Sequence, residues 1–250
     1  MSDVLVHAEG LSKVFRSRKG EVRAAEEISF SCHAGEIFGL LGPNGAGKTT
    51  TLRMLSTILT PTSGKASIAG FDVSEQPDQV REQIGFLATE TGLYDRLTAR
   101  ETLRFFGRIN RLSDEEISQR TQTLFKTLDM ERLADRRVGT FSTGEKQKLS
   151  LARSIIHDPP VLILDEPTFG LDVMAARTVV ETIAMFREQG RTILLSTHIM
   201  RVAEKLCDRI AILYRGRLHA QGTMSELSAQ YGGDDLEEVF FAAVGAEATP

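Results

Sequence analysis

Apolar and polar positions near the start of the chain predict short strands followed by a helix. VLVHA from residue 4 and ISFSC from residue 28 are β-rich runs, and EIFGLLG from residue 36 is apolar enough to be a buried strand. Helical spacing follows in TLRMLSTIL, and PTSG at residue 61 ends that helix before KASIAG returns to strand character. The pattern therefore predicts a strand, loop and helix unit beside an N-terminal β portion.

The pattern becomes helical over about residues 98–157. Three segments have helical spacing, namely TARETLRFFGRI, SDEEISQRTQTLFKTLDM and GEKQKLSLARSII, and Ser113 with Glu116 three residues later marks the start of the second. The strand VLILD at 161, a helix from about 173, the strand TILLS at 192 and a helix from 199 then alternate as in a parallel sheet. We predict an α/β core with a parallel sheet, an N-terminal antiparallel β portion and an inserted helical subdomain.

Domain organisation follows from this alternation and from the chain length. The 250 residues, 41% of them hydrophobic, allow one elaborated α/β domain rather than two full ones. We expect this domain to occupy residues 1–232, with the helical subdomain inserted at about 92–157. Residues 233–250 are expected to form a short amphipathic helix and a loose tail.

Charge and cysteine content narrow the possible partners. A formal net charge of -4 and the lack of basic runs at either end argue against nucleic acid as a partner. Cys32 and Cys207 lie far apart in apolar contexts, which favours buried thiols in a reducing cytosol over a disulfide. No apolar run approaches the roughly 18 residues that span a bilayer, so we expect another protein to anchor any activity at a membrane.

A phosphate-binding loop is predicted between the buried strand and the helix after it. The segment matches the P-loop pattern G-x-x-x-x-G-K-[ST] and consists of Gly42, Pro43, Asn44, Gly45, Ala46, Gly47, Lys48 and Thr49, followed by Thr50. Its glycines let backbone N–H groups curl around phosphate oxygens at the positive end of the helix. Lys48 adds charge toward the β and γ phosphates, and Thr49 can coordinate Mg²⁺. We therefore expect a nucleoside triphosphate with Mg²⁺.

Two carboxylates follow the apolar run VLIL, and together with it they resemble a Walker B motif. Parallel strands deliver such acids at their carboxyl ends, beside the P-loop. Asp165 is expected to hold Mg²⁺ through water, while Glu166 orients the attacking water and accepts its proton. The alternative is a pair of solvated acids at a strand end, which the P-loop upstream disfavours.

The segment FSTGE at residues 141–145 resembles the LSGGQ signature of the ATP-binding subunits of ABC transporters. Ser142 and Gly144 are kept, whereas Phe141, Thr143 and Glu145 depart from the family pattern. The continuation KQKLSLAR, the downstream DEPTFGLD with Asp172 and the order of the motifs match the family. The resemblance covers nearly the whole chain and identifies the substrate as ATP.

This resemblance implies roles for four further groups. Ser142 and the backbone of Gly144 would close over the nucleotide that the P-loop of a second subunit holds, in a homodimer or a heterodimer. His198, after the strand TILLS, would contact the γ-phosphate. Phe15 would stack on adenine, although an aromatic residue in a strand also commonly packs in a core.

The resemblance also implies an integral membrane permease as a separate partner and a cytoplasmic location, peripheral at the inner face of the membrane. HDPPVLILDEPTFGLDV and IGFLATETGLYDRLTARETL are most similar to type-two exporters, including sodium-exporting members, and drug and lipid exporters share these motifs. Two alternatives remain open, a non-transport ABC ATPase that acts as a switch in a soluble assembly complex and a metabolic kinase. The chain has no second P-loop and no long heptad stretch.

One departure from the family concerns the residue after the strand IGFLA, which is usually a glutamine that reaches Mg²⁺. Here Thr89 and Glu90 stand in that place. We expect Mg²⁺ binding to depend chiefly on Thr49 and Asp165. The loop around Thr89, Glu90 and Tyr94 is expected to form the permease docking surface.

Overall fold

The computed structural model describes residues 3–17, 20–89 and 92–245. Its strands are β1 (Val4–Ser17), β2 (Gly20–His33), β3 (Ile37–Leu41), β4 (Ser63–Ile68), β5 (Phe71–Asp72), β6 (Ile84–Leu87), β7 (Val161–Asp165), β8 (Thr192–Thr197), β9 (Arg209–Tyr214) and β10 (Arg217–Gly222). Its α-helices are α1 (Lys48–Leu55), α2 (Pro77–Gln83), α3 (Ala99–Ile109), α4 (Asp114–Thr127), α5 (Thr143–Ile155), α6 (Val173–Glu188), α7 (Met200–Leu206), α8 (Met224–Tyr231) and α9 (Leu236–Val244).

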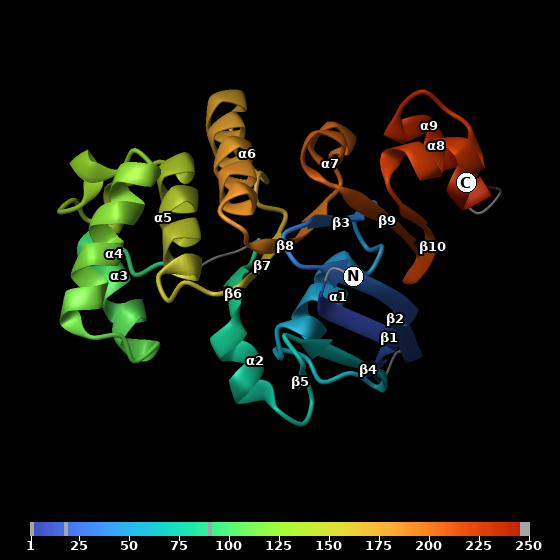
Figure 1. Cartoon of the computed structure of the whole chain (residues 1–250), viewed down its shortest axis with the longest axis horizontal. Helices are drawn as coiled ribbons and strands as arrows, with labels where there is room; N and C mark the ends of the chain where they lie inside the picture. The colour runs from blue at the N-terminus through green and yellow to red at the C-terminus, as the bar shows by residue number, and fades with distance from the viewer. Residues whose placement is uncertain (1–2, 18–19, 90–91, 246–250) are drawn as a thin grey trace.

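A six-stranded sheet in the order β10-β9-β3-β8-β7-β6 forms the centre of the molecule (Figure 1). All neighbours from β9 to β6 run parallel, and only β10 is antiparallel to β9. Every residue of β3, β7 and β8 is buried, as expected for parallel strands that are covered on both faces. The predicted parallel core is confirmed, and the carboxyl ends of β3, β7 and β8 meet at one edge.

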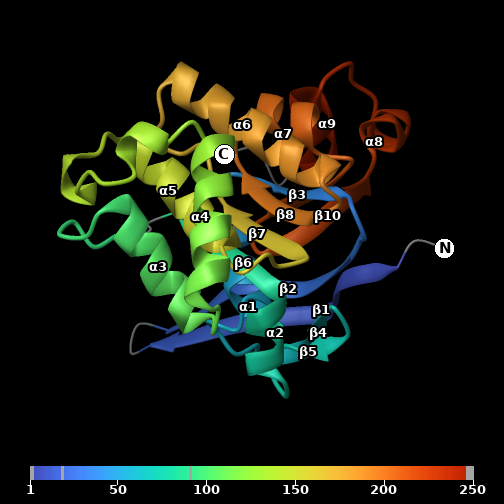
Figure 2. The same cartoon turned by 60° about the vertical axis from the view of Figure 1, so that its left-hand side comes forward.

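The predicted N-terminal antiparallel portion is a four-stranded sheet in the order β2-β1-β4-β5. Its apolar face packs with α1 against one side of the central sheet, where Phe30 stacks on Phe38 with ring centroids 5.0 Å apart. Figures 1 and 2 show this sheet beneath the central one, on the side away from α6 and α7. The P-loop helix α1 is therefore enclosed between two sheets.

The predicted helical insert consists of α3, α4 and α5, which lie between β6 and β7 in sequence and to one side of the sheet (Figure 2). Helices α3, α4 and α5 each begin with a capping box, formed by Thr98 and Glu101, by Ser113 and Glu116, and by Ser142 and Glu145. Apolar side chains of the insert share a core with α6. The exact domain boundaries stay a prediction.

The C-terminal segment contains the expected helix, α9, which Asp235 caps through a hydrogen bond from the amide of Glu238. Leu236, Val239 and Phe240 of α9 pack with α7, α8 and β9 in a third core. Of the described residues, no helix is both long and apolar enough to cross a membrane. Cys32 is buried and Cys207 half-buried, and both thiols are free.

Candidate functional site

The P-loop connects β3 to α1 and adopts a conformation that needs glycine at two positions. Gly47 has a φ of 102°, and a Cβ there would lie 2.5 Å from the carbonyl oxygen of Ala24. A Cβ on Gly42 would lie 2.2 Å from the carbonyl oxygen of Leu213. Larger residues at these two positions would therefore clash with the backbone of β2 and β9, against which the loop packs.

Backbone amides of this loop face a cleft of about 520 Å³. The cleft is lined by Val22, Arg23, Ala24, Pro43, Asn44, Gly45, Ala46, Gly47, Lys48, Thr49, Thr50, Thr89, Glu166, Phe169 and His198. In the described part of the chain, the amides of Gly45, Gly47 and Lys48 have no hydrogen-bond partner. Free amides at a helix N-terminus are the donors that phosphate oxygens need.

Asp165 ends β7 beside the P-loop and is 1% exposed. Its Oδ1 accepts hydrogen bonds from the hydroxyls of Thr49, at 3.1 Å, and Ser196, at 2.6 Å. Its Oδ2 accepts one from the hydroxyl of Thr89 at 3.0 Å. The expected pair Thr49 and Asp165 is therefore in direct contact.

Glu166 lies between two other expected site residues. Its Oε1 is 3.1 Å from Nζ of Lys48, and its Oε2 is 2.9 Å from Nδ1 of His198. Lys48 also donates to the carbonyl oxygens of Gly42 and Pro43 at 2.6 and 3.2 Å. The buried ammonium and carboxylate compensate each other's charge, which an isolated buried ion could not do.

The backbone at Glu166 has a φ of 50°, an uncommon left-handed conformation for a residue other than glycine. The amide of Glu166 is held there by the hydroxyl and the carbonyl oxygen of Ser196, at 3.1 and 3.2 Å. Strained backbone of this kind costs on the order of 1 kcal/mol or more and concentrates at functional sites. The turn after β7 thus aims the carboxylate into the cleft.

With Nδ1–H of His198 donating to Glu166, the Nε2 atom of a neutral ring is an acceptor. The ring can donate to a phosphate only if it is protonated or if the bond to Glu166 breaks. The structure therefore places His198 at the expected cleft but engaged with Glu166.

The chemistry of these residues suits the binding of Mg²⁺ and a nucleoside triphosphate. A hydroxyl and a carboxylate in contact, Thr49 and Asp165, offer the hard oxygen ligands that Mg²⁺ prefers, usually one or two from protein. No group of three or more His, Cys, Asp or Glu side chains in the described ranges could hold a metal on its own. A metal bound here would therefore take further ligands from the phosphates of the nucleotide.

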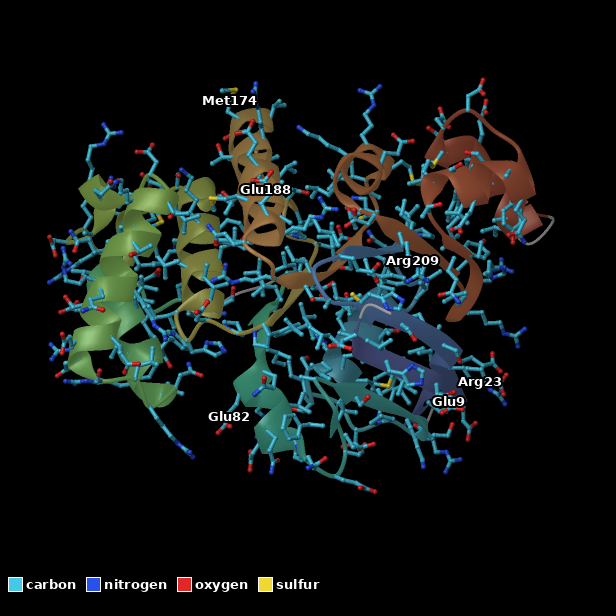
Figure 3. The ribbon with its side chains drawn as sticks, viewed as in Figure 1. Glu9, Arg23, Glu82, Met174, Glu188 and Arg209 are labelled. Carbon is cyan, nitrogen blue, oxygen red and sulfur yellow. The ribbon has the colours of Figure 1, made fainter. Side chains whose placement is uncertain are left out.

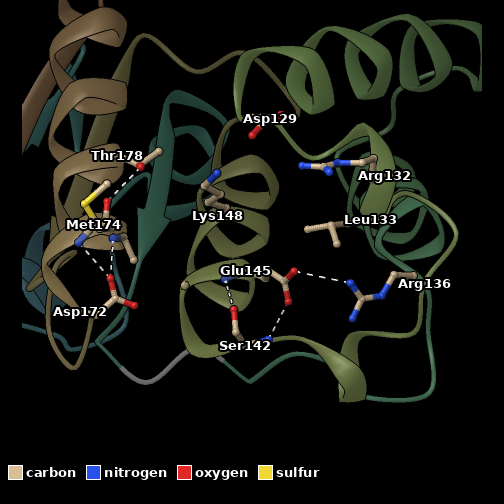
Figure 4. Close-up of a pocket in the computed structure, with 12 residues that line it drawn as sticks. Asp129, Arg132, Leu133, Arg136, Ser142, Glu145, Lys148, Asp172, Met174 and Thr178 are labelled. Carbon is tan, nitrogen blue, oxygen red and sulfur yellow. Dashed lines mark hydrogen bonds and ion pairs between the residues drawn. The ribbon is translucent and has the colours of Figure 1, made fainter.

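The signature residues lie in a different cleft, of about 570 Å³, between α5, α6 and the segment before α5 (Figure 4). The hydroxyl of Ser142 accepts a hydrogen bond from the amide of Glu145, whose carboxylate accepts one from the amide of Ser142 and lies 3.6 Å from Arg136. Gly144 faces Ala175 of α6, where an added Cβ would come within 3.0 Å. Neither signature residue lines the P-loop cleft of the same chain.

Phe15 lies on β1 opposite Val22, which lines the P-loop cleft, but is itself not among the lining residues. Its ring is 41% exposed and lies 5.5 Å from Nζ of Lys13. The role of Phe15 in adenine binding stays a prediction. Figure 3 shows Arg23, beside Val22 on the same sheet, at the edge of the molecule.

Ser196 and Gln147 were not identified from the sequence, and neither were four residues of the cleft lining, Val22, Arg23, Ala24 and Phe169. Ser196 pairs in register with Asp165 across β7 and β8, and a polar residue at the end of an apolar parallel strand was a usable signal. Gln147 of α5 donates to the carbonyl oxygen of Pro167 at 2.7 Å and links the signature helix to the turn after Glu166. Glu90 lies outside the described residues, whereas Thr89 reaches Asp165.

Comparison with known proteins agrees with this geometry. A family model described as "ABC transporter" matches residues 25–169. The ABC transporter ATP-binding protein NatA of Bacillus subtilis (strain 168) is 40% identical over 92% of this chain and 94% of its own length. The Nod factor export ATP-binding protein I of Rhizobium sp. (strain N33) is 39% identical over 96% of this chain and 78% of its own length.

Solved structures show the same fold. The ATP-binding subunit of an ABC transporter superposes with a TM-score of 0.86 at 32% identity, over 96% of this chain and all of its own. The dimeric ATP-binding cassette MJ0796, bound to ADP and Pi in a post-hydrolysis state, superposes with a TM-score of 0.80 at 25% identity, over 88% of this chain and 99% of its own.

Proposed function

The chain belongs to the ABC transporter ATP-binding family, whose members couple ATP hydrolysis to transport, and we propose that the P-loop cleft is its hydrolytic site. One observation carries this proposal. A single cleft is lined by free P-loop amides, Lys48, Thr49, and Glu166 in contact with His198, and Asp165 lies directly behind Thr49 and accepts a hydrogen bond from its hydroxyl. These groups are the cradle, the metal ligands and the base that phosphoryl transfer to water requires.

Glu166 acts in this proposal as the base that orients water and accepts its proton. Lys48 is shared between Glu166 and the loop carbonyls, so a bound γ-phosphate would compete with Glu166 for the ammonium. This competition would free the carboxylate for water when the triphosphate is in place. Mg²⁺, when bound by Thr49 and Asp165, supplies positive charge to the phosphate oxygens.

We propose that hydrolysis needs two ATP-binding subunits. ABC ATP-binding subunits dimerise, and here Ser142 and Gly144 line a cleft separate from the P-loop cleft. A second subunit, identical or different, would bring its signature over the nucleotide. Exposed apolar side chains near the two clefts, Phe169, Val173 and Met174, suit such an interface, and Figure 3 shows Met174 at the outer end of α6.

We propose that a separate integral membrane permease docks beside the helical insert and holds the protein at the inner face of the membrane. Tyr94, Phe105 and Ile109 are large apolar side chains, each 42–58% exposed, and the ring centroids of Tyr94 and Phe105 lie 5.7 Å apart. Next to them, a groove of about 550 Å³ separates α2 from the turn between α3 and α4. Exposed apolar side chains beside a groove suit an inserted helix of a partner.

The proposed cargo is sodium, moved outward. This rests on the similarity to NatA and on the resemblance to sodium-exporting type-two exporters. Relatives named for resistance to linearmycin and for export of Nod factor have 34–39% identity, so an organic cargo is the competing outcome.

The test is purification of the tagged chain from membranes with its bound partner, followed by reconstitution in vesicles. ATP-dependent sodium movement supports the proposal, and movement of an amphipathic dye without sodium movement overturns the cargo. Recovery with soluble assembly factors alone would favour the non-transport alternative.

A further inference from the structure

The buried carboxylate of Asp165 accepts hydrogen bonds from three hydroxyl groups. Thr49 and Ser196 both donate to Oδ1, at 3.1 and 2.6 Å. Thr89 lies 3.0 Å from Oδ2 and 3.4 Å from the carbonyl oxygen of the same residue, so the shorter contact takes its single hydrogen. Among the described residues, Thr89 is the partner recorded for Oδ2.

The three donors belong to different parts of the chain. Thr49 is in the first turn of α1 and Ser196 is in β8, and both elements are packed in the main cores. Thr89 instead belongs to the segment that joins β6 to α3 and is only half-buried. Its hydroxyl therefore depends on how that segment lies against the end of β7.

Two donors on Oδ1 place that oxygen, but the plane of the carboxylate is fixed only when Oδ2 is also held. A hydroxyl such as that of Thr49 can give its hydrogen to Asp165 and keep its lone pairs for a metal. Hydrogen bonds to an ionised carboxylate are among the stronger ones in proteins. Orientation of the carboxylate is thus a separate requirement from its presence.

We propose that Thr89 is a positioning residue that fixes the carboxylate of Asp165 through Oδ2 and so sets the affinity of this site for Mg²⁺. It acts on the metal through Asp165 and not as a ligand, which distinguishes it from the glutamine that the family pattern places at this position. The inference rests on the proposed assignment of Asp165 to Mg²⁺. It concerns binding of the metal more than the chemical step.

The test compares Thr89→Val, which is nearly isosteric and lacks the hydroxyl, with Thr89→Ser, which keeps it. Binding of Mn²⁺ in the presence of a β,γ-imido ATP analogue is followed by electron paramagnetic resonance, and analogue binding in EDTA is measured separately. We expect Thr89→Val to weaken Mn²⁺ binding roughly tenfold, as for loss of a hydrogen bond to a charged group. Thr89→Ser should restore it, and analogue binding in EDTA should be unchanged.

Thr123→Val is the matched control, because the Thr123 hydroxyl donates to the carbonyl oxygen of Gln119 on the exposed face of α4. It should bind Mn²⁺ as the unmodified protein does. Unchanged Mn²⁺ binding in Thr89→Val, equal loss in Thr89→Ser, or loss in the control would each overturn the inference. If Thr89→Val does not fold, Thr89→Ala takes its place under the same criteria.

Asp165→Asn separates this inference from the function on which it rests. If Asp165→Asn also bound Mn²⁺ normally, the assignment of Asp165 to the metal would be wrong. If Asp165→Asn lost Mn²⁺ binding while Thr89→Val kept it, only the role of Thr89 would be wrong.

Discussion

Nζ of Lys48 and Oε1 of Glu166 lie 3.1 Å apart, with 6% and 9% of their side chains exposed. The ammonium expected to bind phosphate and the carboxylate expected to activate water are therefore paired with each other in this structure. Since a bound triphosphate would attract the same ammonium, the two residues should respond differently to substitution.

Glu166→Gln should retain ATP binding and lose most turnover. The amide has nearly the same shape but cannot accept a proton from water, and general-base catalysis is worth roughly 10²–10⁴-fold in rate. Steady-state release of phosphate and equilibrium binding of a fluorescent ATP analogue measure the two effects. Glu181→Gln, on the exposed face of α6, is the control. Turnover within a few-fold of normal would remove Glu166 from the role of base.

Lys48→Ala should weaken ATP binding itself, because it removes positive charge from the phosphate cradle before any chemistry begins. We expect a loss of roughly tenfold or more in affinity, the scale of a lost charge-assisted hydrogen bond. Isothermal titration with ATP measures it, and Lys65→Ala on the exposed part of β4 is the control. An unchanged dissociation constant would contradict the assignment of the loop.

A shared site should be visible by mixing two inactive proteins. Lys48→Ala damages the P-loop cleft and Ser142→Arg blocks the signature cleft, so a mixed dimer contains one intact composite site and one doubly damaged site. We expect each variant alone to be poorly active and the mixture to recover part of the ATP-dependent dimerisation, followed by light scattering. Normal hydrolysis by Ser142→Arg alone would show that the signature makes no contribution.

Much of the fold could be predicted because local signals were strong. The runs around β3, β7 and β8 are apolar, those of β7 and β8 end in polar residues, and the Ser113 and Glu116 capping box is present as expected. Helices α2 and α8 and strands β5, β9 and β10 were not identified. Helix α2 has only seven residues, too few for a periodic pattern, and β10 is largely polar and depends on its pairing with β9.

The site was predictable to the extent that its chemistry lies in contiguous motifs. Contacts between motifs could not be predicted, because the register of the parallel strands decides which side chains meet. Ser196 meets Asp165 only because β7 and β8 pair in that register, and Thr89 reaches Asp165 only because β6 is the next strand. The sequence shows Thr89 where the family has a glutamine, but the contact of Thr89 with the carboxylate of Asp165 appears only in three dimensions.

Burial of the two cysteines yields a prediction about reactivity. Burial raises the pKa of the Cys207 thiol to about 12, and it also raises the pKa of Cys32, chiefly through desolvation. Both thiols should therefore stay protonated between pH 7 and 9, where the reactive thiolate would otherwise form. Mass spectrometry after iodoacetamide treatment should find little alkylation in the native protein and two modified sites in urea. Rapid native labelling would place at least one thiol at the surface.

Glu145 stands where the family signature has a neutral glutamine. A carboxylate there would repel the phosphates of a nucleotide held by a second subunit, unless a cation offsets it. Arg136 lies 3.6 Å from Glu145 and donates to the carbonyl oxygen of Thr140, which holds it at the signature cleft (Figure 4). Arg136→Ala should therefore lower ATP-dependent dimerisation and turnover a few-fold, a modest effect because the ion pair is partly exposed to solvent.

Adding Glu145→Gln to Arg136→Ala should restore activity, because the amide removes the charge. It also preserves the capping box with Ser142, in which glutamine serves as well as glutamate. The measurement is the rate of ATP hydrolysis across protein concentration for both single variants and the double variant, with Arg132→Ala, a neighbouring cation that lines the same cleft, as the control. A double variant no more active than Arg136→Ala would show that the arginine supports the signature through packing against Phe141, whose ring lies 5.6 Å from its guanidinium, and not through charge.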